Sequence, residues 1–371
     1  MRVSVPSEVK NREYRVAITP VGVHELVRNG HEVFVQSGAG VGSAISDEEY
    51  EAQGAVMVDT AAEAWGAGEL VLKVKEPVAS EYGFLRDDLV LFTYLHLAAD
   101  RPQTDALMAS GTTAIAYETV QLPSGLLPLL YPMSEVAGCL APQVGAHAMM
   151  KANGGRGVLM GCVGGVPNAK VVVLGAGVAG QNAANVALGM GADVTILDTD
   201  LDKLRMSFWR YENRVKQIVS SSLSIRDQVL AADMVIGTVL IPGAKAPKLV
   251  TNEMVARMKP GSVLVDVAID QGGCFEDSHP TTHDDPTFMV HGTVFYCVAN
   301  MPGAVPNTST WALTNATLPY VLQVAQKGWK QALRDNEPLA KGLNVWNGQV
   351  TYAGVAEAFG LETASLSEAL A

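Results

Sequence analysis

Charge is scarce in this sequence, and positive charge is scarcer than negative. Only 17% of the 371 residues are charged, and 38 acidic against 26 basic side chains leave a net charge of -12. An acidic surface repels the phosphate backbone of DNA and RNA over most of its area. We therefore expect no nucleic-acid partner.

Cysteine is also scarce. The four cysteines include no C-x-x-C pair, and no group of histidines accompanies them at the spacing of a metal site. So few cysteines in so long a chain exclude a disulfide framework, and reduced thiols in a cytoplasmic protein are the simplest interpretation. We also expect no bound metal.

Long apolar runs are missing as well. No stretch reaches the roughly 18 uncharged apolar residues that mark a membrane-spanning helix. The first residues, MRVSVPSEVK, lack the apolar core of a signal peptide. These features predict a soluble protein with no membrane partner.

Glycine and short β-branched runs, in contrast, are plentiful. The 36 glycines suit a fold with many tight turns between strands and helices. The short runs alternate with longer helical patterns, which is typical of an α/β protein with a mainly parallel sheet. In chain order, strands are predicted at residues 3–5, 32–36, 70–75, 89–95, 113–117, 171–174, 193–197, 234–237, 263–269 and 293–298.

Helical patterns separate these strands and suggest two domains. Thr19 is placed to cap a helix at residues 20–29. A proline-rich loop at 122–132 resembles a crossing between domains, and a long helical pattern at residues 134–153 follows it. From residue 309 onward the pattern is helical, with helices predicted at 313–332 and near 355–359 and no evident strand. We expect this tail to pack on the first domain.

The strongest local motif is the segment VVVLGAGVAGQNAANVALGMGADVTILD. It contains Gly175-x-Gly177-x-x-Gly180 between an apolar strand and an alanine-rich helix, and a second strand ends in Asp198. This acid follows at about the expected spacing of roughly 20 residues. The glycines allow a tight turn, close approach of a pyrophosphate and close helix packing, while the helix N-terminus attracts phosphate. Asp198 would bind the ribose hydroxyls and repel a 2′-phosphate, which favours NAD over NADP.

Three polar residues of the first domain lie near the carboxyl ends of predicted strands or in a strand–helix connection. The fork of Arg15 suits a carboxylate, Lys75 ends the run LVLKVKEP, and His96 ends LVLFTYLHL. Ligands of open α/β sheets bind beyond such strand ends. Together the three residues indicate a corner that binds anions and handles protons. Taken one at a time, Arg15 also fits a surface ion pair, Lys75 a solvated strand end and His96 a core histidine.

Asp270 directly follows the strand predicted at 263–269 in the second domain, within the segment GSVLVDVAIDQGGC. Its position places it beside the presumed cofactor site. An aspartate that only caps a turn is the alternative, because this residue is common at strand ends.

These segments together resemble the alanine dehydrogenase family, which also includes the NAD(P) transhydrogenase α chain. The matching stretches are EVKNREYRVAITP, LVLKVKEP, LFTYLHLAAD, IAYETV, PLLYPMSEVAG, GGRGVLMG, VLGAGVAG, LIPGAKAPKLV, DVAIDQGGCFE, FYCVANMPGAVP and ALTNATLPYV. The resemblance implies two Rossmann-like, doubly wound parallel-sheet domains with a cleft between them. It assigns residues 1–127 and 309–371 to a substrate domain and residues 128–308 to an NAD-binding domain.

The resemblance also implies a reaction and roles for matching residues. The reaction is reversible NAD-dependent oxidative deamination of L-alanine to pyruvate and ammonia, in a homohexamer. Arg15 and Lys75 would bind the substrate, and His96 and Asp270 would transfer protons. The implied cofactor contacts are Ser134, Gly175, Gly177, Val178, Ala179, Gly180, Asp198, Lys203, Ser220, Val239, Leu240, Val267, Ala268, Ile269, Asp270, Val298, Ala299, Asn300 and Met301.

Other functions remain open at this point. They are a nucleotide-binding subunit like the transhydrogenase α chain, a related dehydrogenase for lysine or saccharopine, and a regulator that binds NAD without catalysis. The sequence also departs from the family, which usually has basic residues where this chain has Cys139, His279 and Asn307.

Overall fold

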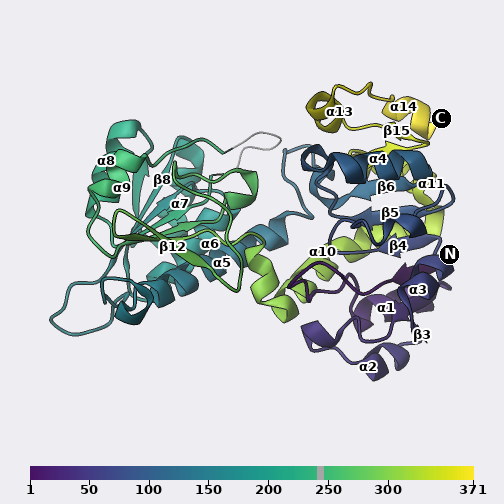
Figure 1. Cartoon of the computed structure of the whole chain (residues 1–371), viewed down its shortest axis with the longest axis horizontal. Coiled ribbons are helices and arrows are strands. Elements are labelled where there is room, and N and C mark those ends of the chain that lie inside the picture. Colours follow the sequence, from purple (N-terminus) through teal and green to yellow (C-terminus); the bar gives the residue numbers. More distant parts are fainter. Residues whose placement is uncertain (240–245) are drawn as a thin grey trace. The chain divides into compact units, whose positions relative to one another are not determined.

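The computed structural model describes residues 1–239 and 246–371. These residues form two compact units, coloured along the chain in Figure 1. The first unit combines Met1–Met133 with Val305–Ala371, and the second consists of Ser134–Ala304.

The first unit contains an eight-stranded sheet in the order β15-β14-β6-β5-β4-β1-β2-β3. Strands β1 to β6 are parallel, whereas β14 runs antiparallel to β6 and β15 antiparallel to β14. The strands are β1 (Arg2–Val5), β2 (Glu32–Gln36), β3 (Val56–Val58), β4 (Leu70–Leu72), β5 (Val90–Thr93), β6 (Thr113–Ala116), β14 (Leu343–Trp346) and β15 (Gln349–Val350).

Helices of the first unit come from both ends of the chain. Pro20 starts α1 at its first position, where the missing N–H costs nothing, and α10 likewise starts at Pro306. The helices are α1 (Pro20–Arg28), α2 (Asp47–Glu51), α3 (Ala61–Ala67), α4 (Arg101–Ser110), α10 (Pro306–Lys327), α11 (Trp329–Asp335), α12 (Glu337–Ala340), α13 (Ala353–Phe359) and α14 (Leu366–Leu370).

The second unit contains a seven-stranded sheet in the order β12-β13-β11-β10-β7-β8-β9. Six strands are parallel and β12 is antiparallel at one edge. Counted along the chain, the parallel strands have the order 3-2-1-4-5-6 of a Rossmann fold. The strands are β7 (Lys170–Leu174), β8 (Asp193–Asp198), β9 (Lys216–Val219), β10 (Met234–Gly237), β11 (Val263–Asp266), β12 (Thr287–Val290) and β13 (Thr293–Tyr296).

Among the described residues, five helices accompany this second sheet. The first of them, α5, spans Tyr131–Ala148, so it starts within the predicted crossing loop and ends before residue 153. The others are α6 (Val178–Gly189), α7 (Leu201–Tyr211), α8 (Ser222–Ala231) and α9 (Asn252–Ala256).

The central strands of both sheets are buried along their whole length. Strands β5, β10 and β11 read VLFT, MVIG and VLVD, and every one of their residues is buried. Helices on both faces of a parallel sheet exclude water from both sides, so continuous apolar runs replace alternation. The predicted α/β class with parallel sheets is confirmed.

The C-terminal segment corrects one prediction. Residues after 309 do contain strands, because β14 pairs with β6 and β15 with β14. Figure 1 shows these yellow strands beside the blue β6. Both strands are very short, and β14 is bulged, so their alternation is too brief to recognise in sequence.

Several other boundaries differ from prediction. Strands β4 and β5 end at Leu72 and Thr93, before residues 75 and 95. The helix expected at 313–332 is broken at Gly328, whose φ of 74° ends α10. Strands β3, β9 and β12 were not predicted; they lie at or near sheet edges, and much of their surface remains accessible.

Candidate active site

A glycine turn joins β7 to α6 in the second unit. Gly175 has a φ of +102°, a left-handed conformation that favours glycine. A Cβ on Gly180 would lie 1.8 Å from the carbonyl oxygen of Gly175, so only glycine allows the helix to approach the turn. Gly177 is the N-cap of α6 and supplies no side-chain cap, and a Cβ there would meet nothing within 4 Å in the described residues. The turn thus presents backbone N–H groups to open space, which fits a pyrophosphate.

Asp198 ends the neighbouring strand β8 and faces this turn. Its carboxylate accepts hydrogen bonds from the N–H of Ala176 at 2.7 Å and of Asp200 at 2.8 Å. Lys203 Nζ lies 3.9 Å from it, and the Ser220 N–H donates to the Asp198 carbonyl at 2.9 Å. The structure therefore brings Asp198, Lys203 and Ser220 together beside the glycine turn.

Two further predicted contacts flank the turn. A Cβ on Gly175 would lie 3.1 Å from a methyl group of Val239, and Leu240 lies outside the described residues. From the other side, a Cβ on Gly138 of α5 would lie 2.3 Å from the Ala179 carbonyl oxygen. Ser134 lies one helical turn before Gly138 in α5.

The remaining predicted contacts of this unit follow β11 and β13. Residues Val267–Asp270 leave the end of β11, where the Val267 N–H donates to Gly237 at the end of β10, and Asp270 is exposed. Residues Val298–Met301 follow β13 and contact a different segment: Ala299 donates to Thr281, and His283 bonds the Asn300 carbonyl at 3.3 Å. Asn300 has a φ of +58°.

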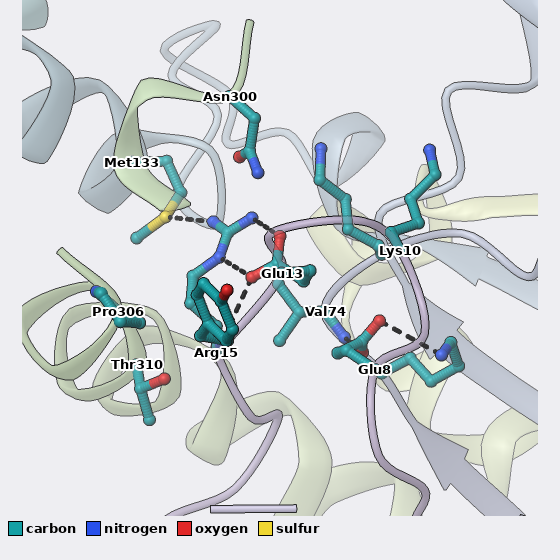
Figure 2. A network of polar contacts seen from close by, with 12 residues as sticks. Glu8, Lys10, Glu13, Arg15, Val74, Met133, Asn300, Pro306 and Thr310 are labelled. Carbon is teal, nitrogen blue, oxygen red and sulfur yellow. Dashed lines mark hydrogen bonds and ion pairs between the residues drawn. The ribbon is translucent and has the colours of Figure 1, made fainter. Parts of the chain in front are cut away.

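Arg15 of the first unit is buried in a two-pronged ion pair with Glu13, as Figure 2 shows. Nε and Nη2 of Arg15 each donate to one carboxylate oxygen of Glu13 at 2.6 Å, and Nη1 lies 3.1 Å from the Met133 sulfur. Burial by itself would raise the pKa of Glu13, but the hydrogen bonds and charge of Arg15, with the charge of Lys75, lower it. The same carboxylate raises the pKa of Arg15 against the effect of burial. Both groups are therefore ionised, and the surface ion pair considered for Arg15 is excluded because the pair is buried.

Lys75 follows a second buried charge cluster. Lys73 is fully buried, with Nζ 3.1 Å from Glu8 and 2.9 Å from Glu81. Glu8 also accepts the N–H of Val74 at 2.6 Å. The cluster holds the backbone just before Lys75, which is half-buried three residues beyond β4.

His96 lies on an unusual turn beyond β5. Its φ is +50°, in the left-handed region, and its ring is exposed, which excludes a core histidine. Glu118 accepts the His96 N–H at 2.6 Å and the Leu95 N–H at 3.2 Å. The His96 ring stacks on Tyr94 with centroids 5.8 Å apart. Burial raises the pKa of Tyr94, and the nearby Arg15 opposes this shift. Arg15, Tyr94 and His96 thus share one neighbourhood.

The three departures from the resembling family have local partners. His279 stacks on Phe288 with centroids 3.7 Å apart. The Asn307 amide donates to the Ser43 carbonyl at 2.6 Å, and Cys139 lies 3.9 Å from the Asn182 oxygen. Each side chain therefore has a structural contact where a basic residue is usual.

Sequence reasoning missed the acidic partners of the candidate residues. Glu13, Glu8, Glu118 and Asp266 were not singled out as site residues, although each bonds a candidate residue or the backbone beside one. For Asp266 there was a usable signal, because it is an ionisable residue in the otherwise apolar strand VLVD.

In the part of the chain that the structure describes, no group of three or more potential metal ligands gathers. No helix within the same residues has the length and apolar character to cross a membrane.

The fold and the glycine turn define a two-unit α/β protein with a Rossmann-type nucleotide site. The family model "Alanine dehydrogenase/PNT, N-terminal domain" matches residues 4–137, and the corresponding C-terminal model matches residues 141–353. The chain belongs to the alanine dehydrogenase/PNT family, which confirms the resemblance seen in the sequence.

Individual relatives span the whole chain. It is 61% identical over 371 residues to the alanine dehydrogenase of Mycolicibacterium smegmatis, covering 100% of both chains. It is 56% identical over 362 residues to the alanine dehydrogenase of Halomonas elongata, covering 98% of both. A solved L-alanine dehydrogenase matches with a TM-score of 0.94 and 49% identity, covering 97% of this chain and 99% of that one. A transhydrogenase from Sinorhizobium meliloti matches with a TM-score of 0.80 and 28% identity, covering 95% and 99%.

Proposed function

We propose that this chain is an NAD-dependent alanine dehydrogenase. The observation that carries the proposal is the 61% identity to an alanine dehydrogenase along the full length of both chains. The reaction converts L-alanine, NAD and water into pyruvate, ammonium, NADH and a proton. It is reversible.

In this proposal the second unit binds NAD. The N-terminus of α6 holds the pyrophosphate, and Asp198 holds the adenosine ribose and repels the 2′-phosphate of NADP. Bound NAD supplies the hydride acceptor. Cys139, His279 and Asn307, which stand where the family usually has basic residues, lie outside the glycine turn and Asp198.

The first unit binds the amino acid. Arg15 and Lys75 hold the substrate carboxylate, and Lys75 polarises the oxygen that develops on Cα. Loss of hydride from Cα leaves an iminium, water adds to it, and the resulting carbinolamine releases ammonia as pyruvate forms. His96 moves protons between water, nitrogen and oxygen, and Asp270 orients the water or amine.

The test is an absorbance assay for NADH with a panel of L-amino acids and with NAD or NADP. We expect turnover with L-alanine and NAD, and His96→Ala should lower kcat by about 10²–10⁴-fold. Turnover confined to lysine or saccharopine would replace alanine as the substrate. Hydride exchange between two nucleotides with no amino acid present would support the transhydrogenase-like alternative instead.

Assembly is a separate part of the proposal. We propose a homohexamer, on the basis of family membership alone. Light scattering coupled to size-exclusion chromatography measures the mass directly, and a monomer or dimer at working concentration contradicts it.

A further inference from the structure

The loop after β11, residues 267–275, contains the exposed Asp270 and is called the Asp270 loop. It contains the short 3-10 turn Ile269–Gln271, which ends at Gly272 with a φ of +91°. Its two ends meet again at the end of β11, where Asp266 is the last strand residue.

Asp266 joins both ends of the Asp270 loop. One carboxylate oxygen accepts the N–H of Ala268 at 3.1 Å. The other accepts the N–H of Cys274 at 2.8 Å, the N–H of Phe275 at 3.3 Å and the hydroxyl of Ser278 at 2.6 Å. The side chain is fully buried, so all four bonds are shielded from water.

The backbone of the loop is shaped around this carboxylate. Gly273 has a φ of +77°, and a Cβ there would lie 2.6 Å from the Asp266 oxygen. Lys248 adds a second clamp, since Nζ donates to the carbonyls of Gly272 at 2.5 Å and Phe275 at 2.8 Å. Asp266 and Lys248 thus both hold the backbone of the loop.

An ionised carboxylate suits this arrangement, and an amide does not. Four donors converge on two oxygens, and an amide in their place would turn an NH₂ group toward donors on one side or the other. Burial raises the pKa of Asp266, while the Ser278 hydroxyl and the three backbone N–H groups oppose that shift and favour the charge. A buried charge without such partners would be strongly destabilising.

We propose that Asp266 is a positioning residue that fixes the Asp270 loop, and through it Asp270 and the cofactor contacts Val267–Asp270. Asp266 acts through the backbone and contacts neither substrate nor cofactor. The inference rests on the proposed dehydrogenase function for its catalytic consequence. Its structural part is independent of that function.

The experiment compares Asp266→Asn and Ser278→Ala with Asp285→Asn, which removes one exposed negative charge in the same unit. Hydrogen–deuterium exchange of the amides of residues 267–275 is measured alongside NADH binding by fluorescence and kcat and KM for alanine. Asp266→Asn should sharply lower protection of the Ala268, Cys274 and Phe275 amides, which bond Asp266. Protection in β7 and β10 should be retained, and kcat should fall by roughly 10²-fold, as expected for a small misplacement of reacting groups. We expect KM for alanine to change much less than kcat.

Ser278→Ala is the milder variant, for the case that Asp266→Asn does not fold. It removes one of the four hydrogen bonds to the Asp266 carboxylate, so hydrogen exchange in the loop should rise. We expect kcat to fall about tenfold, which corresponds to about 1.4 kcal/mol in activation free energy. Asp285→Asn should match the wild type. The proposal is overturned if hydrogen exchange in the loop of Asp266→Asn equals that of the wild type. It is also overturned if Asp266→Asn loses protection throughout the protein while the loop of Ser278→Ala exchanges as in the wild type. If the wild type does not oxidise alanine, the proposed function fails, while loop exchange and NADH binding still decide the positioning role.

Discussion

Glu13 and Arg15 form a buried pair whose strength depends on both partners. Each exposes almost none of its side chain, and they share two hydrogen bonds of 2.6 Å. Glu13→Gln leaves a buried guanidinium without its counter-charge, so we expect a loss of about 3–5 kcal/mol in the free energy of unfolding. Urea denaturation measures it. Glu25→Gln is the control, because the Glu25–Arg28 pair is more exposed and should contribute no more than about 1 kcal/mol. Equal losses in the two variants contradict the prediction.

The same pair predicts an acid-sensitive part of the stability. The pKa of Glu13 lies below its ordinary value of 4.5 because Arg15 outweighs the effect of burial. A lowered pKa in the folded state contributes stability that is present above pH 4.5 and is lost as the pH falls through the folded value. The free energy of unfolding of the wild type should therefore decrease below pH 4.5 more steeply than that of Glu13→Gln. Parallel pH profiles would exclude this origin.

The cysteines differ strongly in reactivity. Burial, reinforced by the charge of Asp266, raises the pKa of Cys274 and of Cys297 to about 12, whereas Cys162 is exposed. The thiolate is the reactive form, so at pH 8 a thiol reagent should modify Cys162 quickly and the two buried thiols only after unfolding. Cys162→Ser should remove the fast phase. Stability from the two buried thiols is complete below pH 9, their ordinary value, and declines as the pH rises toward 12.

Sequence could identify the type of site residue but not its partner. Arg15, Lys75 and His96 were selected because charged or polar groups beyond the ends of parallel strands gather at one edge of a sheet. The pairing of Glu118 with the His96 N–H joins residues 22 positions apart. Such pairing depends on strand order and on a left-handed backbone at a non-glycine residue, and neither has a local signal.

Helix α6 provides a test of close packing at the scale of one element. Gly180→Ala places a methyl group against the Gly175 carbonyl, so the helix must move away from β7, and we expect weaker NADH binding and lower stability. Gly189→Ala is the matched control in the same helix, because a Cβ there meets no described residue within 4 Å. It should be neutral or stabilise by up to about 1 kcal/mol. Fluorescence titration and thermal melting separate the two. Identical NADH affinity in both variants would contradict the role of Gly180.

Strands in apolar runs between clear turns were predictable, and the edge strands β3, β9 and β12 were not. Strands β2 and β10 have the predicted bounds, since their apolar runs are flanked by clear turns. Strands β4 and β5 end at Leu72 and Thr93, although Lys73 and Leu95 beyond them are still buried. The strands predicted from this apolar pattern were therefore too long, because buried residues continue past the last residue of each strand.

At the scale of the molecule, the first sheet depends on the end of the chain. Leu343 and Val345 of β14 are buried against β6, which would otherwise be an open edge. A chain that stops at residue 342 should expose this edge, so we expect proteolysis within residues 1–133 while residues 134–304 remain resistant. Limited proteolysis with mass spectrometry distinguishes the two regions. A first unit that stays resistant would show that β14 contributes little.

The late position of β14 and β15 also sets an order of events on the ribosome. Translation delivers the whole of residues 134–304 before the strands that finish the first sheet. Domains generally fold as they emerge from the ribosome. We therefore expect the second unit to fold before β14 and β15 have been synthesised and the first sheet can be completed. Chains arrested near residue 335 should then bind NADH yet expose the first unit to chaperones. The family's two domains would mature in reverse of their order in the gene.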